Sequence, residues 1–179
     1  MSKTQYYVAA SLDGFIADAN GRLEWLFQFN EAEGVREHYD AFMSSVGAMA
    51  MGAATYEFLV ERGEPWPYGE LPTWVFTHRT LPAIHGANLR FSRTDPAEVH
   101  AEMLAAAGGR NIWMIGGGKL AAQFVTRGLL DELWLSVVPV VLGAGAPLLS
   151  APLLQPLQLA QVTRFGGGLV ELRYSLARA

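Results

Sequence analysis

The stretch with the clearest chemical potential in this chain is a run of three glycines and a lysine, Gly116–Lys119. The apolar run Ile112–Ile115 precedes it, and apolar residues at helical spacing follow it as far as Gly128. This pattern predicts a strand, a tight turn and a helix. The free N–H groups of the first helical turn would favour an anion such as a pyrophosphate, because they present positive partial charge.

The glycine run also has a purely structural interpretation, and both interpretations stay open at this point. Glycines at a strand–helix junction allow close packing even where no ligand binds. The Rossmann fingerprint GxGxxG is absent, since Leu120 and Ala121 follow the lysine. The Walker A pattern is absent as well, because Leu120 stands where a Ser or Thr would hold magnesium.

Two further segments could meet an anion at the ends of predicted strands. Gly52 follows the apolar run Ala48–Met51 and begins a short helix, in which Thr55 could cap the helix or donate its hydroxyl to a phosphate. The β-rich run Thr73–Thr77 continues into a basic pair, His78 and Arg79. Since the carboxyl ends of parallel strands meet at one edge of a sheet, we expect these segments and the glycine run to converge.

The candidates for catalysis are two aspartates near the N-terminus. Asp13 lies in the loop Leu12–Leu23, after the strand predicted at Gln5–Ser11, and such loops often cover a ligand site. Asp13 is therefore the preferred polar contact to a substrate, with a turn-forming role in its Asp-Gly pair as the alternative. Asp40, at the edge of the apolar stripe of the helix predicted at Glu31–Ser45, could face a cleft or simply solvent.

Two aromatic residues are candidates for the wall of a substrate pocket, although core packing would explain either of them. They are Trp25 and Tyr56. The four histidines show no HExxH pattern or other ligand spacing, so we predict no metal site.

The elements that must position these residues alternate between strand and helix along the chain. Asp95-Pro96 followed by Glu98 is a typical helix start, and that helix is expected to end near Ala107. The last two β-rich runs, Leu157–Arg164 and Leu169–Ala177, are expected to form an antiparallel hairpin. The pattern predicts one α/β domain over residues 1–179, with a mostly parallel central sheet, an antiparallel edge and flanking helices.

Composition narrows the class of protein. The chain has 179 residues, of which 51% are hydrophobic and 17% charged, so an ordered domain is expected rather than a disordered chain. The net charge of −4 without a basic patch argues against nucleic acid as a partner. The absence of cysteine fits a reducing cytoplasm, and the apolar run Leu133–Leu149 is too interrupted by Pro and Gly to span a membrane. We also expect a homodimer that associates through the apolar final strands.

Four segments, in this order and spacing, resemble the dihydrofolate reductase-like superfamily, in particular the RibD C-terminal family, the reductase domain of bacterial riboflavin biosynthesis. They are YVAASLDGFIA at Tyr7–Ala17, MGAATYE at Met51–Glu57, IGGGKLAAQF at Ile115–Phe124 and DELWLSVVPVVLGAGAPLL at Asp131–Leu149. The resemblance implies a three-layer dihydrofolate reductase-like fold and an NADPH-binding reductase.

Carried over residue by residue, the resemblance also implies a cofactor site. The backbone of Ala9 and Ala10 would lie near the nicotinamide. Gly52 and Thr55 would lie at the phosphates, and Thr77, His78 and Arg79 would lie near the adenosine 2′-phosphate. The pyrophosphate would be held by the run Gly116, Gly117, Gly118, Lys119 and Leu120. Ala53 stands where the family often has a basic residue, and this would leave Arg79 with a larger share of the preference for NADPH.

These features predict a cytoplasmic NADPH-dependent reductase. It would transfer a hydride to a C=N or C=O carbon of a small pterin- or pyrimidine-like substrate, which the protein would position beside the dihydronicotinamide. The alternative is a non-catalytic nucleotide-binding or regulatory module on the same fold. Turnover separates the two hypotheses, because a binding module would bind NADPH without oxidising it.

Overall fold

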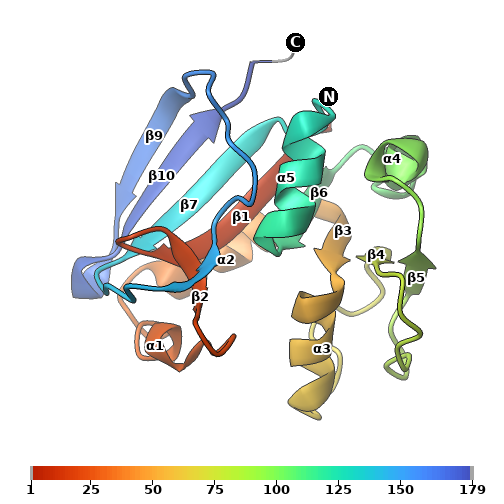
Figure 1. Cartoon of the computed structure of the whole chain (residues 1–179), viewed down its shortest axis with the longest axis horizontal. Coiled ribbons are helices and arrows are strands. Elements are labelled where there is room, and N and C mark those ends of the chain that lie inside the picture. The colour runs from red at the N-terminus through yellow and green to blue at the C-terminus, as the bar shows by residue number, and fades with distance from the viewer. Residues whose placement is uncertain (1, 178–179) are drawn as a thin grey trace.

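The computed structural model describes residues 2–177 and places eight of the strands in one sheet (Figure 1). Met1, Arg178 and Ala179, which the predicted domain includes, lie outside the described residues. The strand order is β5-β4-β3-β6-β1-β7-β10-β9. The bounds are β1 Thr4–Ser11, β3 Val46–Gly52, β4 Thr73–Phe76, β5 Leu89–Ser92, β6 Asn111–Gly116, β7 Glu132–Val138, β9 Gln158–Arg164 and β10 Val170–Ser175.

Pairing within this sheet is parallel from β5 through to β7, and β10 and β9 add an antiparallel edge. This arrangement confirms the predicted fold class. Helices cover both faces of the parallel part of the sheet. Nearly every residue of β3, whose sequence is VGAMAMG, is therefore buried.

The helices lie on both faces of the sheet. In Figure 1, α5 (Gly118–Thr126) crosses in front of β1 and β6, and α2 (Val35–Ser44) lies behind the sheet. The helix α4 (Pro96–Ala106) packs beside α5, and α3 (Ala53–Glu61) follows β3 at its carboxyl end. The core beneath α4 and α5 is the largest of three clusters of buried apolar side chains, and its fully buried members include Tyr6, Met103, Ile112, Met114 and Phe124.

The start of α4 follows its predicted chemistry. Asp95 is the N-cap, and its carboxylate accepts a hydrogen bond of 2.9 Å from the backbone N–H of Ala97. Pro96 occupies the first helical position, where its missing N–H costs nothing.

Three local predictions need correction. The loop Leu12–Leu23 contains a strand, β2 (Phe15–Asp18), which pairs with β8 (Gly145–Pro147). Gly145 makes this pairing possible, because a Cβ there would lie 2.0 Å from the carbonyl oxygen of Ala17. A short helix α1 (Glu24–Phe27) then precedes α2.

The long helix begins at Val35 and not at Glu31, since its N-cap Gly34 has a left-handed φ of 82°. Within residues 2–177, no helix is long and apolar enough to cross a membrane.

Candidate functional site

The predicted convergence of strand ends is confirmed by the sheet register. Met51 of β3 pairs with Gly116 of β6, and Gly52 pairs with Phe76 of β4. A Cβ on Gly52 would lie 3.7 Å from both the carbonyl oxygen of Gly116 and the nitrogen of Gly117. The two glycine junctions therefore touch each other at the carboxyl edge of the sheet.

Two helices begin at these junctions, and neither has a side-chain cap. Gly52 is the N-cap of α3, Gly117 is the N-cap of α5, and each helix is nine residues long. The N–H groups of both first turns consequently have no side-chain acceptor. Two neighbouring helix N-termini of this kind present positive partial charge to the same region, which suits an anionic group.

The glycine run serves packing at one position and leaves room at another. A Cβ on Gly118 would lie 2.2 Å from the carbonyl oxygen of Pro147, so close backbone packing requires glycine there. A Cβ on Gly117 would meet only a methyl group of Ile16 at 3.7 Å, an ordinary contact. Gly116 has a φ of 147°, and the Gly116–Gly117 peptide bond is cis. The packing interpretation therefore holds for Gly118, and the anion-binding interpretation stays a prediction for which Gly117 leaves room.

The side chains of three other residues predicted beside the phosphates lie in different surroundings. The hydroxyl of Thr55 lies 3.6 Å from the Cβ position of Gly116, so this side chain faces the junction. The side chain of Lys119 is exposed at the start of α5. Leu120 is 5% exposed and packs in the core, so only its backbone N–H could serve an anion.

The segment after β4 is tied into local interactions. The hydroxyl of Thr77 accepts a hydrogen bond of 3.0 Å from the backbone N–H of Arg79. The Arg79 guanidinium pairs in bidentate fashion with the carboxylate of Glu57 on α3, with both N–O distances at 2.7 Å. His78 is exposed. The charge of Arg79 is thus already matched by Glu57, which the sequence did not indicate.

An opening in the sheet pairing lies beside the junctions. β1 pairs with β6 only from Thr4 to Tyr6, although β1 continues beside β7 as far as Ser11. The Tyr7 carbonyl, which β6 no longer meets, accepts a hydrogen bond of 3.0 Å from the indole N–H of Trp113. In α/β sheets, ligands bind at the carboxyl ends of strands where neighbouring connections diverge, and this is such a place.

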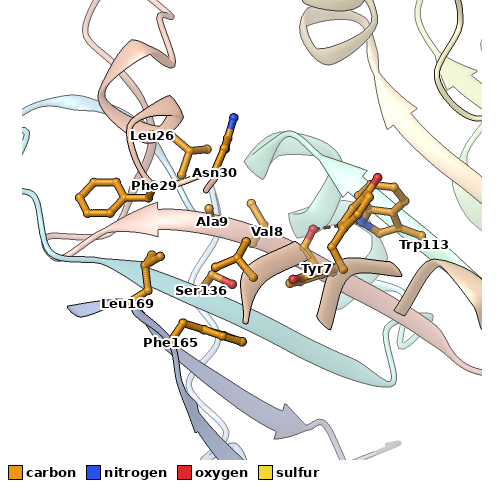
Figure 2. A pocket seen from close by; sticks show the side chains of 12 residues that line it. Tyr7, Val8, Ala9, Leu26, Phe29, Asn30, Trp113, Ser136, Phe165 and Leu169 are labelled. Carbon is orange, nitrogen blue, oxygen red and sulfur yellow. Dashed lines mark hydrogen bonds between the residues drawn. The ribbon is translucent and has the colours of Figure 1, made fainter. Parts of the chain in front are cut away.

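A cavity of about 270 Å³ lies on the α2 side of this opening. Figure 2 shows Leu26 and Phe29 on one side of it, Phe165 and Leu169 on another, and strand residues Val8, Ala9 and Ser136 between them. The full set of lining residues is Tyr7, Val8, Ala9, Leu26, Phe29, Asn30, Val35, Tyr39, Trp113, Ser136, Phe165 and Leu169. Ala9 therefore faces the cavity, whereas Ala10 is 1% exposed and offers only its backbone.

Two segments that are distant in sequence close the cavity together. The turn between β9 and β10 packs against the residues before α2. There the backbone N–H of Gly166 donates a hydrogen bond of 3.0 Å to the carbonyl of Glu33. A Cβ on Gly166 would come within 2.8 Å of the Glu33 nitrogen, so glycine permits this contact. The docking brings Phe165 against the cavity.

A buried charged network lies next to the cavity wall. Glu171 is fully buried, and its carboxylate lies 2.8 Å from Nε2 of His38 and 3.1 Å from Nε of Arg173. The guanidinium carbon of Arg173 also lies 3.3 Å from the ring centroid of Trp134. Burial, followed by the charge of Glu171, raises the pKa of the Tyr7 hydroxyl, so this group remains a protonated donor at neutral pH.

The structure places the two predicted catalytic aspartates away from the cavity wall. The Asp13 carboxylate accepts hydrogen bonds from the Ser11 hydroxyl at 2.7 Å and from the N–H groups of Leu142 and Gly143 at 3.1 and 2.7 Å. The Ser11 hydroxyl and these N–H groups lower its pKa from 3.8 to about 2. Asp13 thus ties the loop after β1 to the loop after β7, and Asp40 is exposed on α2.

The two predicted aromatic walls also lie elsewhere. Tyr56 is fully buried in a core with Met51 and Val75. Its hydroxyl donates a hydrogen bond of 2.6 Å to the carbonyl of Pro82. Trp25 is half-buried, its indole N–H is bonded to the carbonyl of Arg22, and its neighbour Leu26 faces the cavity instead. The core-packing alternative therefore holds for Tyr56.

Alternation along a strand could have indicated one of the missed cavity residues. In β1, every second residue shares a face, so Tyr7 accompanies Ala9 on the α2 side while Tyr6 faces the other core. Phe165 and Leu169 had no sequence signal, because only the fold brings their turn to this cavity.

Comparison with known proteins assigns a family to this site and fold. The family model described as the RibD C-terminal domain matches residues 61–170. The uncharacterized protein YwjB of Bacillus subtilis is 35% identical over 146 residues, which are 82% of either chain. The riboflavin biosynthesis protein RibD of Corynebacterium ammoniagenes is 26% identical over 157 residues, covering 84% of this chain but 47% of RibD.

The solved structure of a protein described as a putative riboflavin biosynthesis protein of Shewanella sp. PV-4 has a TM-score of 0.80 at 26% identity, and the match covers 98% of this chain and 99% of that chain. Acinetobacter baumannii RibD has a TM-score of 0.70 at 17% identity, with 98% of this chain and 58% of that chain covered, and supports the fold alone. The chain belongs to the RibD C-terminal domain family, within the dihydrofolate reductase-like fold.

Proposed function

We propose that the protein is an NADPH-dependent reductase that transfers a hydride to a C=N or C=O carbon of a small pterin- or pyrimidine-like substrate. The observation that carries the proposal is the pair of uncapped helix N-termini at Gly52 and Gly117, beside an opening in the sheet that leads to an aromatic cavity. The membership of the RibD C-terminal domain family supports the same class of activity.

Each part of the site has a distinct task in this proposal. The first-turn N–H groups of α3 and α5 would hold the pyrophosphate, with the Thr55 hydroxyl beside them. The opening next to Ala9 would admit the dihydronicotinamide, which supplies the hydride when bound. The cavity would exclude water and hold the substrate ring against the opening, so that the protein contributes mainly orientation.

The preference for NADPH would depend on Arg79. Its guanidinium is paired with Glu57 and more than half exposed, so a 2′-phosphate would have to share or displace that carboxylate. The exposed side chains of His78 and Lys119 would add positive charge when protonated.

Proton delivery would use hydroxyl groups or water. The residues that line the cavity include no carboxylate, but Tyr7, Tyr39 and Ser136 bring hydroxyl groups to it. Burial raises the pKa of both tyrosines, so they can donate hydrogen bonds to a substrate carbonyl or ring nitrogen.

We further propose a cytoplasmic homodimer that acts on a small molecule and not on nucleic acid. The edge strand β9 exposes Leu159 and Val162, each by 50%, and such apolar side chains on a sheet edge favour association with a second copy. The chain is acidic and lacks cysteine, in keeping with the other parts of the proposal.

The test is turnover of NADPH. Purified protein would be mixed with NADPH and with dihydropterins or pyrimidine ribosylamines, and the loss of reduced-nicotinamide absorbance would be followed. Substrate-dependent oxidation supports the reductase. Tight NADPH binding without oxidation by any of these compounds favours the nucleotide-binding module, which the absence of a cavity carboxylate would explain.

A further inference from the structure

The cavity beside β1 is lined without a single charged side chain. Of the residues around it, five are aromatic, five are aliphatic, and Asn30 and Ser136 are polar but uncharged. An anionic group placed there would lose its hydration without gaining a cation, and this is costly. A planar uncharged ring would instead bury its faces against aromatic side chains.

Two basic side chains behind the cavity wall, His38 and Arg173, are already paired with a carboxylate. His38 and Arg173 both pair with the buried carboxylate of Glu171, and the Arg173 guanidinium lies over Trp134. A phosphate drawn to either of them would have to compete with a fully buried carboxylate. Breaking such a pair leaves an uncompensated buried charge.

We propose that this cavity selects an uncharged planar heterocycle without a phosphate or carboxylate substituent, oriented by neutral hydrogen bonds to Ser136 and Asn30. This inference rests on the proposed function in one respect, namely that the ring bound here is the hydride acceptor. The binding preference itself does not require NADPH.

The experiment compares two fluorescent probes that differ by one charge, pterin and pterin-6-carboxylate, each titrated into the protein without NADPH. Pterin should bind about 10-fold more tightly or better, because the carboxylate must be desolvated without a partner. Equal affinity, tighter binding of the carboxylate, or binding of neither probe would overturn the proposal.

Variants locate the preference in this cavity. Asn30 is an exposed lining residue, so the Asn30→Lys variant should fold normally. The added charge should strengthen binding of pterin-6-carboxylate and so reduce the difference in affinity between the two probes. Asn30→Gln should leave that difference unchanged. Val35→Trp should fill the cavity and weaken both probes. An unchanged difference in Asn30→Lys would contradict the assignment to this cavity.

The two proposals can fail separately. If NADPH neither binds nor is oxidised while the pterin preference holds, only the reductase function fails. If NADPH is oxidised but the carboxylate probe binds at least as well as pterin, only the inference about charge fails.

Discussion

A carboxylate placed at Gly117 should abolish the proposed pyrophosphate site without harming the fold. Gly117 is the N-cap of α5 with φ of −93°, which any residue adopts, and its Cβ would meet only a methyl group at 3.7 Å. Asp and Asn are both favourable N-caps, so Gly117→Asp and Gly117→Asn should each change helix stability by only a few tenths of a kcal/mol. The two variants differ only in charge.

The magnitude follows from Coulomb's law. A carboxylate about 4 Å from a phosphate costs about 4 kcal/mol at an effective dielectric constant near 20, and screening in this half-exposed site reduces that figure. Either side chain would occupy first-turn N–H groups that the phosphate needs, so this effect is shared by the two variants and the charge makes the difference. We therefore expect NADPH to bind Gly117→Asp roughly 100-fold more weakly than Gly117→Asn.

The assay is a fluorescence titration of each variant with NADPH, accompanied by urea unfolding to show that both are folded. Equal NADPH affinity in the Asp and Asn variants would refute the placement of the pyrophosphate at α5. Unfolding of the Gly117→Asn variant would show instead that the space around Gly117 does not admit a side chain.

Three further predictions concern neighbouring residues. Glu57→Gln should free Arg79 from its ion pair and raise the ratio of NADPH affinity to NADH affinity about 5-fold, because an exposed ion pair contributes roughly 1 kcal/mol. An unchanged ratio in paired titrations would show that Arg79 does not contact the 2′-phosphate. Gly118→Ala should lower the free energy of unfolding by about 3 kcal/mol, since its Cβ would lie 2.2 Å from a backbone oxygen, whereas urea unfolding of Gly117→Ala should show little change. Asp13→Asn should lower the free energy of unfolding by its full amount above pH 3.8, and the difference from the unmodified protein should disappear as the pH falls towards about 2. The pKa of Asp13 is lower in the folded state than its ordinary value, so its stabilisation exists above the ordinary value and is lost on protonation; a pH-independent difference in unfolding free energy would contradict this.

The order of strands and helices was predictable because it depends on local patterns. The apolar runs of β1, β3 and β6, and the capping chemistry at Asp95, were each sufficient for their own element. The pairing of β2 with β8 was not predictable, since it joins residues more than a hundred positions apart and β2 alone is only four residues long. The start of α2 was placed too early, at Glu31, although the apolar stripe of this helix begins only at Val35, directly after Gly34 with its left-handed φ.

The candidate site was predictable where it depends on the backbone. The glycine junctions converge because parallel strand ends must converge, and Gly52 and Gly117 follow such ends. Side-chain roles were less predictable: Asp13 looked free in sequence but has three hydrogen-bond donors, and Arg79 is matched by Glu57 from another element. The cavity itself depends on Phe165 and its turn docking near Glu33, which only the folded chain reveals.

The carboxyl edge of the sheet, with its two glycine junctions, is proposed to bind NADPH beside the substrate cavity. Titration of the unmodified protein with NADPH and with NADH, followed by fluorescence, tests this most directly. We expect saturable binding of NADPH, tighter than that of NADH because of the proposed 2′-phosphate contact near Arg79. Failure of both nucleotides to bind would contradict it and would leave the glycine junctions with a structural role alone.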